Sequence, residues 1–149
     1  MIEIRRLEAS EAELWVEAVS EIISPGAREE RLISLTETEA VLKDDRCYLM
    51  VALESGDPVG LLNAYRFPDA SAGGFLVYLY DIEVSPESRR CGIGKGLLEL
   101  LIAQCESDKV KLIWAGTEST NFAARETFES TAAELEGDSY VEYEWDLED

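Results

Sequence analysis

The sequence has no histidine, few cysteines and few basic residues. Because histidine is absent from all 149 residues, Ser-His-Asp and Cys-His nucleophilic machinery and HExxH metal sites are excluded. The three cysteines, Cys47, Cys91 and Cys105, form no CxxC pair. Neither a disulfide framework nor a zinc site is supported, and no metal is predicted. Any chemistry must therefore use carboxylates, tyrosines, backbone amides or a cofactor.

Long apolar runs are also missing. No segment approaches the roughly 18 residues of a membrane span, and the first residues contain no signal-peptide core, so we expect a cytoplasmic protein without a membrane partner. The 13 basic and 32 acidic residues give a formal net charge of -19, which would repel nucleic acid and attract cations. The alternative is that the acidity only keeps the surface soluble, as in salt-adapted proteins.

Strand and helix patterns are present along the whole chain, whose length and 46% hydrophobic content predict one domain over residues 1–149. Period-2 or continuous apolar patterns predict strands over 2–7, 47–54, 59–67, 75–85, 111–116 and 140–147. Helical spacing predicts helices over 10–23, 28–43, 94–107 and 121–134, the first capped by Ser10 with Glu13. The order βααβββαβαβ predicts a mixed α/β fold with a hairpin and one parallel βαβ crossover.

A glycine-rich loop joins the long strand to the helix that follows it, with the sequence SRRCGIGKG. Amides at a helix start bind anions, and Arg89 and Arg90 can add charge-assisted hydrogen bonds to phosphate. A Walker loop is excluded because Gly96 follows Lys95, and a dinucleotide fingerprint is excluded because Leu97 replaces its third glycine. The loop therefore predicts a pyrophosphate site of another kind, with a solvated surface turn as the alternative.

Two motifs resemble those of the GNAT superfamily of N-acetyltransferases. The segment RRCGIG at 89–94 is similar to its acetyl-CoA loop, Arg/Gln-x-x-Gly-x-Gly/Ala. Asn121, Ala124 and Phe128 are similar to its Asn-x-x-Ala-x-x-x-Tyr helix. The element order is also similar along essentially the whole chain. The resemblance implies a GNAT-type fold in which the two central parallel strands splay apart and admit the pantetheine arm of acetyl-CoA.

The same resemblance implies acetyl-CoA as the cosubstrate. Strand backbone groups would pair with the pantetheine arm, and loop amides and cations would hold the pyrophosphate. The implied cofactor-binding residues are Ile82, Val84, Arg89, Arg90, Cys91, Gly92, Ile93, Gly94, Lys95, Asn121 and Phe128. Where most members have a tyrosine that protonates the leaving thiolate, this chain has Phe128, so we expect water, Tyr140 or Tyr143 to substitute.

Within the superfamily, the segment YLYDIEVSPESRRCGIG is similar to aminoglycoside 3-N-acetyltransferases, and the strand over 59–67 resembles theirs too. This implies an aminoglycoside acceptor, acetylated at its 3-amino group. A polycation also suits the acidic chain. The alternatives are another cationic amine, such as a polyamine, an amino acid or a protein N-terminus, and a module that binds acetyl-CoA without turnover.

Carboxylates are the candidate catalytic groups. Strict alternation places Asp81 and Glu83 on one face of the long strand and Tyr80 and Ile82 on the other. A carboxylate near the acyl group can accept the ammonium proton, so we predict Asp81 as base or substrate anchor, with Glu83 second. The predicted acceptor contacts are Tyr80, Asp81, Glu142 and Glu144. For Glu142 and Glu144, the alternative is that they simply lie on the solvent-exposed face of an edge strand. Exposed edge strands also allow a homodimer.

Overall fold

The computed structural model describes residues 1–23 and 33–148 of the chain. It separates into two compact units, Met1–Gly116 and Thr117–Asp149. That residues 1–149 act as a single domain stays a prediction. Among the helices that the structure describes, none is long and apolar enough to cross a membrane.

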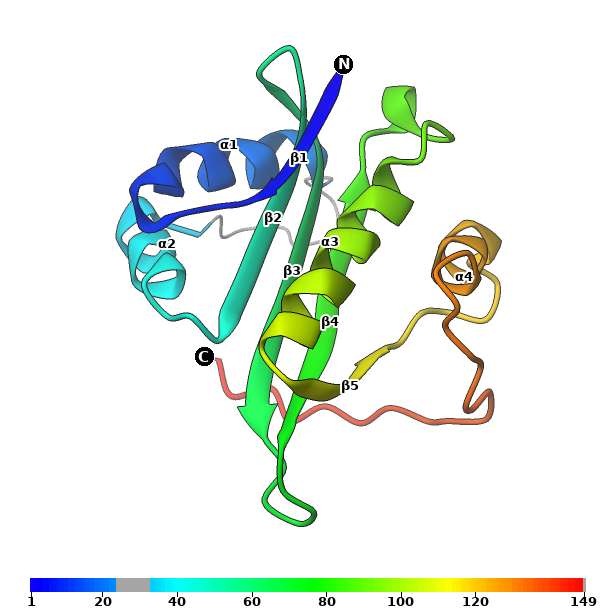
Figure 1. Ribbon diagram of the computed structural model, residues 1–149. Coiled ribbons are helices and arrows are strands. Elements are labelled where there is room, and N and C mark those ends of the chain that lie inside the picture. The colour runs from blue at the N-terminus through cyan, green and yellow to red at the C-terminus, as the bar shows by residue number, and fades with distance from the viewer. Residues whose placement is uncertain (24–32, 149) are drawn as a thin grey trace. The chain divides into compact units, whose positions relative to one another are not determined.

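The first unit is built on a five-stranded sheet in the order β1-β2-β3-β4-β5 (Figure 1). The strands are β1 (Ile2–Arg6), β2 (Cys47–Glu54), β3 (Asp57–Pro68), β4 (Phe75–Val84) and β5 (Val110–Ala115). Neighbours from β1 to β4 are antiparallel, whereas β4 and β5 are parallel. The predicted hairpin, the parallel crossover and the mixed α/β class are therefore confirmed.

Helices cover both faces of this sheet. Its helices are α1 (Ala12–Ile22), α2 (Leu35–Leu42) and α3 (Ile93–Ser107). The side chains of Trp15 and Ala18 pack with Leu49, Val51 and Leu61 on one face, while α3 crosses the other face and packs against all five strands (Figure 1). Successive residues of β2 are buried without alternation, because a strand covered on both faces has no solvent side.

The starts of the first two helices differ from the predictions. A 3₁₀ turn (Ala9–Glu11) precedes α1, and the carboxylate of Glu11 accepts the Glu8 amide N–H at 3.0 Å, so the predicted Ser10 cap is wrong. Residues 28–32 of the second predicted helix lie outside the described residues. Helix α2 begins after Ser34. The Ser34 hydroxyl accepts the Glu37 amide N–H at 3.1 Å and so gives a hydrogen-bond acceptor to one of the N–H groups that a first helical turn leaves unpaired.

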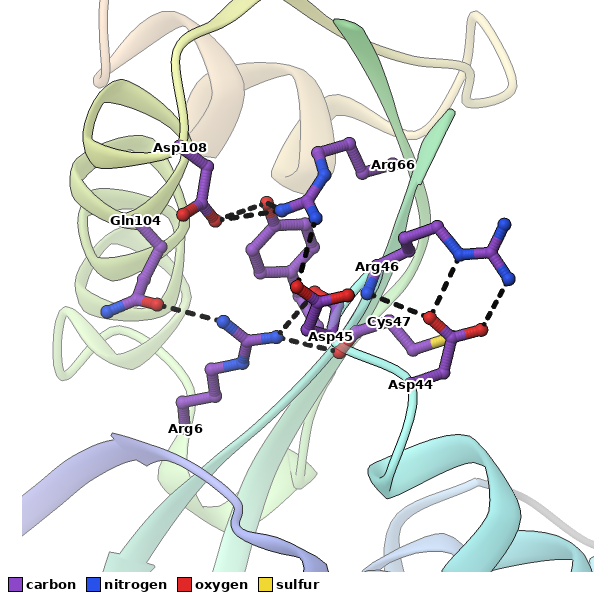
Figure 2. A network of polar contacts seen from close by, with 9 residues as sticks. Arg6, Asp44, Asp45, Arg46, Cys47, Arg66, Gln104 and Asp108 are labelled. Carbon is purple, nitrogen blue, oxygen red and sulfur yellow. Dashed lines mark hydrogen bonds and ion pairs between the residues drawn. The ribbon is translucent and has the colours of Figure 1, made fainter. Parts of the chain in front are cut away.

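A partly buried polar network anchors the C-terminal end of α3 to the sheet (Figure 2). The hydroxyl of Tyr48, a fully buried residue, donates to Asp108 Oδ2 at 2.7 Å and accepts from Arg66 Nη1 at 2.9 Å. The guanidinium of Arg6 stacks 4.4 Å above the Tyr48 ring and donates to Gln104 Oε1 at 3.0 Å. Burial, and then the hydrogen bond to Asp108, raises the pKa of Tyr48 to about 12. We call these five residues the Tyr48 network.

The second unit contains α4 (Phe122–Glu129). The predicted helix over 121–134 is too long, because the chain leaves the helix at Glu129 and Ala132 has a positive φ of 68°. The predicted strand over 140–147 is wrong: no strand is described between 130 and 148, and Val141 and Leu147 are 78% and 90% exposed. Alternating side chains do not suffice for a strand, which also needs a neighbour for its backbone hydrogen bonds.

Candidate active site

At the edge of the sheet, β5 ends before its parallel neighbour β4, and we call the point where it ends the fork. Their register runs from Phe75 opposite Val110 to Leu79 opposite Ala115, where β5 ends, but β4 continues to Val84. Beyond Leu79, the structure describes no strand beside this edge of β4. The pairing of the two predicted parallel strands thus stops partway along β4, at the edge of the sheet rather than at its centre, and it leaves Ile82 and Val84 where an extended ligand could pair with their backbone groups.

A β-bulge lies at the start of the fork. On β3, Asn63 is opposite Asp81 whereas the next residue, Ala64, is opposite Leu79. Tyr80 is therefore the extra residue on β4. A bulge breaks the strict alternation of a strand and redirects the side chains around it, so the face of Tyr80 cannot be deduced by counting residues.

The bulge brings Tyr80 to the face that carries Asp81. The Tyr80 ring lies 6.3 Å, centroid to centroid, from the rings of Tyr65 and of Tyr78, both edge to face. Tyr65 and Tyr78 are opposite each other in the register of β3 and β4 and so share a face. The prediction that Tyr80 and Asp81 face opposite ways was wrong, and an aromatic ring beside a carboxylate is the result.

Asp81 is held by a side chain that the sequence analysis did not single out. Asn63 Nδ2 donates to Asp81 Oδ2 at 3.2 Å, and Asn63 Oδ1 accepts the Asp81 amide N–H at 3.0 Å. Asn63 is only 8% exposed. The sequence signal that could have identified Asn63 is that it is the one side-chain amide in the apolar run over 59–64.

Glu83 is the second carboxylate of this face. Desolvation raises the pKa of the Glu83 carboxyl above its ordinary value, the negative charge of Asp81 raises it further, and Arg89 opposes the rise. A raised pKa makes a carboxylate a better proton acceptor near neutral pH. The structure thus brings the two predicted catalytic carboxylates together beside the fork, as a pair with unequal surroundings.

The loop after β4 presents backbone amides at the start of α3. A 3₁₀ turn (Pro86–Ser88) leads into it, Arg90 has a φ of 66°, and Gly92 caps α3 with a φ of 76°. The first-turn N–H groups of a helix lack intrahelical acceptors. A left-handed residue followed by a right-handed one gathers such groups into an anion-binding concavity. Gly92 therefore suits the predicted phosphate contact, and Gly94 lies in the first helical turn.

Gly96, the glycine at the end of the loop, is a packing residue. A Cβ on Gly96 would lie 2.5 Å from Ile4 Cδ1, so Gly96 permits the close packing of α3 on β1. Ile93 is likewise a packing residue, 3% exposed. Ile93 was also predicted to contact phosphate, and any such role would rest on its backbone amide alone.

Cationic side chains surround this loop. Arg89 Nε donates to the Val84 carbonyl oxygen at 3.4 Å, and Lys95 lies 3.9 Å from the Glu99 carboxylate. Arg90 is exposed and has no hydrogen bond or ion pair with any residue that the structure describes. These weak attachments leave the cations available to an anion.

The thiols differ in their surroundings. Cys91 is exposed on the loop, and Cys105 is 2% exposed in α3. Burial raises the pKa of the Cys105 thiol to about 11, as expected for a residue of the core. Within residues 1–23 and 33–148, no group of three or more cysteine, aspartate or glutamate side chains could hold a metal ion.

Four predicted site residues belong to the second unit. Asn121 caps α4, where its Oδ1 accepts the Ala124 amide N–H at 3.1 Å, and Phe128 is the penultimate residue of that helix. Glu142 and Glu144 are exposed and lie outside any helix or strand, so the predicted acidic strand face does not form. The roles of Asn121 and Phe128 toward acetyl-CoA stay predictions.

Comparison with known proteins identifies this arrangement. The model of the acetyltransferase (GNAT) family matches residues 10–132. An aminoglycoside acetyltransferase from an uncultured soil metagenomic sample, solved with trehalose, has a TM-score of 0.85 at 20% identity over 99% of this chain and 97% of its own. AAC(6')-Iy in complex with the bisubstrate analogue CoA-S-monomethyl-acetylneamine has a TM-score of 0.79 at 19% identity, over 97% of this chain and 99% of its own.

A third solved structure is the ribosomal-protein-alanine N-acetyltransferase from Brucella melitensis biovar Abortus 2308. Its TM-score is 0.73 at 21% identity, over 97% of this chain and 100% of its own. At such identities these likenesses demonstrate a shared fold. Two of the three proteins are aminoglycoside acetyltransferases, whereas the third is a ribosomal-protein-alanine N-acetyltransferase.

Proposed function

Because the chain belongs to the acetyltransferase (GNAT) family and is an acetyl-CoA-dependent N-acetyltransferase, we propose that it acetylates an amine of an aminoglycoside, at the 3-amino group. The observation that carries the proposal is the face of β4 beside the fork, where Asp81 and Glu83 stand next to the Tyr80 ring. Carboxylates attract the ammonium groups of an amino sugar, and an aromatic ring can pack against the apolar face of the sugar ring.

The cosubstrate would use the fork and the loop together. The pantetheine arm pairs with the backbone of Ile82 to Val84 on the edge that β5 leaves open. The pyrophosphate lies against the amides of residues 90 to 95, with Arg89 and Arg90 supplying charge. This places the thioester near the bulge, because the arm enters the sheet where the two strands part.

The acetyl group then moves directly to the amine. Asp81 accepts a proton from the substrate ammonium, directly or through water, and the freed nitrogen lone pair attacks the thioester carbonyl carbon. The amide N–H of Ile82 stabilises the negative charge that develops on the carbonyl oxygen. The carbon–sulfur bond breaks as the amide forms, the nitrogen releases its second proton to water, and the CoA thiolate takes a proton from water or a nearby tyrosine. Binding both reactants together supplies much of the rate.

The acceptor proposal has support at two levels. The formal net charge of -19 draws polycations toward the whole molecule. Among proteins of the same fold, an aminoglycoside acetyltransferase has been solved in complex with sisomicin. The 3-amino assignment rests on the resemblance of the segment from Tyr80 to Ile93 to aminoglycoside 3-N-acetyltransferases.

The test measures CoA thiol release with a panel of acceptors and the position of the acetyl group in the product by NMR. Gentamicin-type aminoglycosides, spermidine, free amino acids and short peptides form the panel. We expect turnover on aminoglycosides and a product acetylated at the 3-amino group. A product acetylated at another amine would overturn the regiochemistry, and turnover confined to peptides, amino acids or spermidine would overturn the acceptor class.

We further infer that the protein works in the cytoplasm as a homodimer. The three cysteines are unpaired, which suits a reducing compartment. The edge strands β1 and β5 each pair with a single neighbour in the sheet, and such edges are natural pairing surfaces. Light scattering in solution tests the dimer: a mass near the 16.6 kDa of one chain would contradict it.

A further inference from the structure

We propose that Asn63 is a positioning residue that fixes the carboxylate of Asp81 for proton transfer, an inference that rests on the proposed role of Asp81. The sequence motifs do not include Asn63. It lies in the middle of β3, opposite Asp81 in the register, and both polar atoms of its side chain contact that one residue.

The orientation of the Asn63 amide follows from its partners. A backbone N–H can only donate, so the atom that faces the Asp81 N–H at 3.0 Å must be the amide oxygen. The NH₂ group then faces Asp81 Oδ2, at 3.2 Å, and offers a donor to a group that, when ionised, only accepts. A flipped amide would place donor against donor and acceptor against acceptor, so the pair fits in one way.

The bulge explains why a side chain is needed at this point. Tyr80 is an extra residue on β4, so the regular backbone ladder is interrupted between the pairs Ala64–Leu79 and Asn63–Asp81. The Asn63 oxygen serves the Asp81 amide N–H in the interrupted stretch. The backbone and the carboxylate of Asp81 are therefore both tied to β3, and a bulged strand that would otherwise be adjustable is fixed in one conformation.

Burial makes this choice of residue informative. Asn63 is 8% exposed and its chain neighbours Leu62 and Ala64 are fully buried. A buried amide costs free energy unless its hydrogen bonds are made, and an apolar residue would fill the space without that cost. Because both hydrogen bonds end on Asp81, holding Asp81 is the function that the amide serves.

Four variants separate positioning from plain stability. Asn63→Leu removes both hydrogen bonds at similar volume. Asn63→Asp keeps the acceptor for the amide N–H but sets a carboxylate against Asp81. The exchange Asn63→Asp with Asp81→Asn can keep both hydrogen bonds, of which only the one between the two side chains reverses its direction, and it moves the carboxylate to β3. Thr38→Val is the matched control, because Thr38, a residue of α2, is fully buried and its hydroxyl donates to the carbonyl oxygen of Ser34, the residue before the helix.

The readouts are kcat, KM for each substrate, acetyl-CoA affinity by calorimetry and melting temperature, with Asp81→Asn as reference. Misplacing a reacting group by about 1 Å can cost about 100-fold in rate. We expect Asn63→Leu to lower kcat about 100-fold and Asn63→Asp at least tenfold, with acetyl-CoA affinity within twofold of wild type. The exchanged pair should fold, bind acetyl-CoA and be as slow as Asp81→Asn. Thr38→Val should change the melting temperature alone.

Each contrary result has a defined meaning. If Asp81→Asn is slow but Asn63→Leu retains wild-type kcat, the positioning role is overturned while the proposed function stands. If Asn63→Leu does not fold, Asn63→Asp decides in the same way. Full activity of the exchanged pair would show that the carboxylate need not lie on β4. Full activity of Asp81→Asn would overturn the proposed base and the positioning role together.

Discussion

The sequence contains two Arg-Arg pairs, and they are used in different ways. Arg5 forms ion pairs with Glu3 and Glu11, and Arg6 donates to Gln104 Oε1 and to two backbone carbonyls at 3.0 Å. In the loop before α3, Arg89 makes one long hydrogen bond of 3.4 Å to a carbonyl. Arg90 makes none with the residues that the structure describes and holds a positive φ of 66°.

The difference shows how an acidic chain separates structural from binding cations. Arg5 and Arg6 are engaged by acceptors of the protein itself, and they join the first strand to the helices beside it. The second pair lies on a loop whose amides also lack internal acceptors, so an incoming anion meets charge and donors together. Adjacent arginines in a sequence therefore indicate a binding loop only when their partners are missing from the fold.

The largest expected effect is on acetyl-CoA binding. Charge-assisted hydrogen bonds are worth about 1.5–3 kcal/mol each, so Arg89→Ala with Arg90→Ala should weaken acetyl-CoA binding at least about 100-fold. The melting temperature should stay within about 2 °C, because few internal contacts are lost. Isothermal titration and thermal unfolding measure the two quantities. An unchanged acetyl-CoA affinity would remove the loop from the binding site.

The complementary change is Arg5→Ala with Arg6→Ala. It removes hydrogen bonds, two ion pairs and the stacking on Tyr48, so we expect the free energy of unfolding to fall by about 2–3 kcal/mol. For a chain of this size that lowers the melting temperature by about 5–10 °C. Acetyl-CoA affinity should stay within twofold at a temperature where the variant is folded. A loss of affinity without loss of stability would reverse the distinction between the two pairs.

Alkaline pH should weaken the Tyr48 network selectively. The folded pKa of about 12 lies above the ordinary value of about 10 for an unfolded tyrosine. The contribution of Tyr48 to stability is therefore complete below pH 10 and is lost as pH rises through about 12, a loss of about 2–3 kcal/mol. Urea unfolding from pH 9 to 12 measures it, with Tyr48→Phe as the comparison. An equal loss in Tyr48→Phe would mean that another group causes it.

The smallest effect is a divergence between the two substrates in salt. The net charge of -19 repels the polyanionic acetyl-CoA at long range and attracts a polycationic acceptor, and salt screens both interactions. Raising NaCl from 0.05 to 0.5 M should change each association rate by about threefold, upward for acetyl-CoA and downward for the aminoglycoside. Stopped-flow kinetics follow both rates. A decrease for both would show that the two loop arginines dominate the field that acetyl-CoA meets.

Most of the sheet could be predicted because its strands are continuous apolar runs between turn residues. The Cys47–Glu54 strand and the parallel crossover follow directly from such patterns. The loop and the two carboxylates of the long strand were predicted as well. The bulge at Tyr80 could not be, because it is a property of pairing between strands rather than of either strand alone.

Two other features could not be predicted from the sequence, for related reasons. Asn63 gains its importance from the residue opposite it, and a single sequence does not give the register. The alternation from Tyr140 to Leu147 resembles a strand, but no strand forms there in the described chain, since pairing with a neighbour decides whether an extended segment becomes a strand.

The most direct test of the account is the rate of CoA thiol release on an aminoglycoside by wild-type protein and by Asp81→Asn, with acetyl-CoA affinity measured on the same samples. A positioned base contributes about 100- to 10,000-fold. We predict a loss of kcat in that range with acetyl-CoA affinity unchanged. Wild-type kcat in Asp81→Asn would contradict the account, because the carboxylate at the fork would then take no part in the transfer.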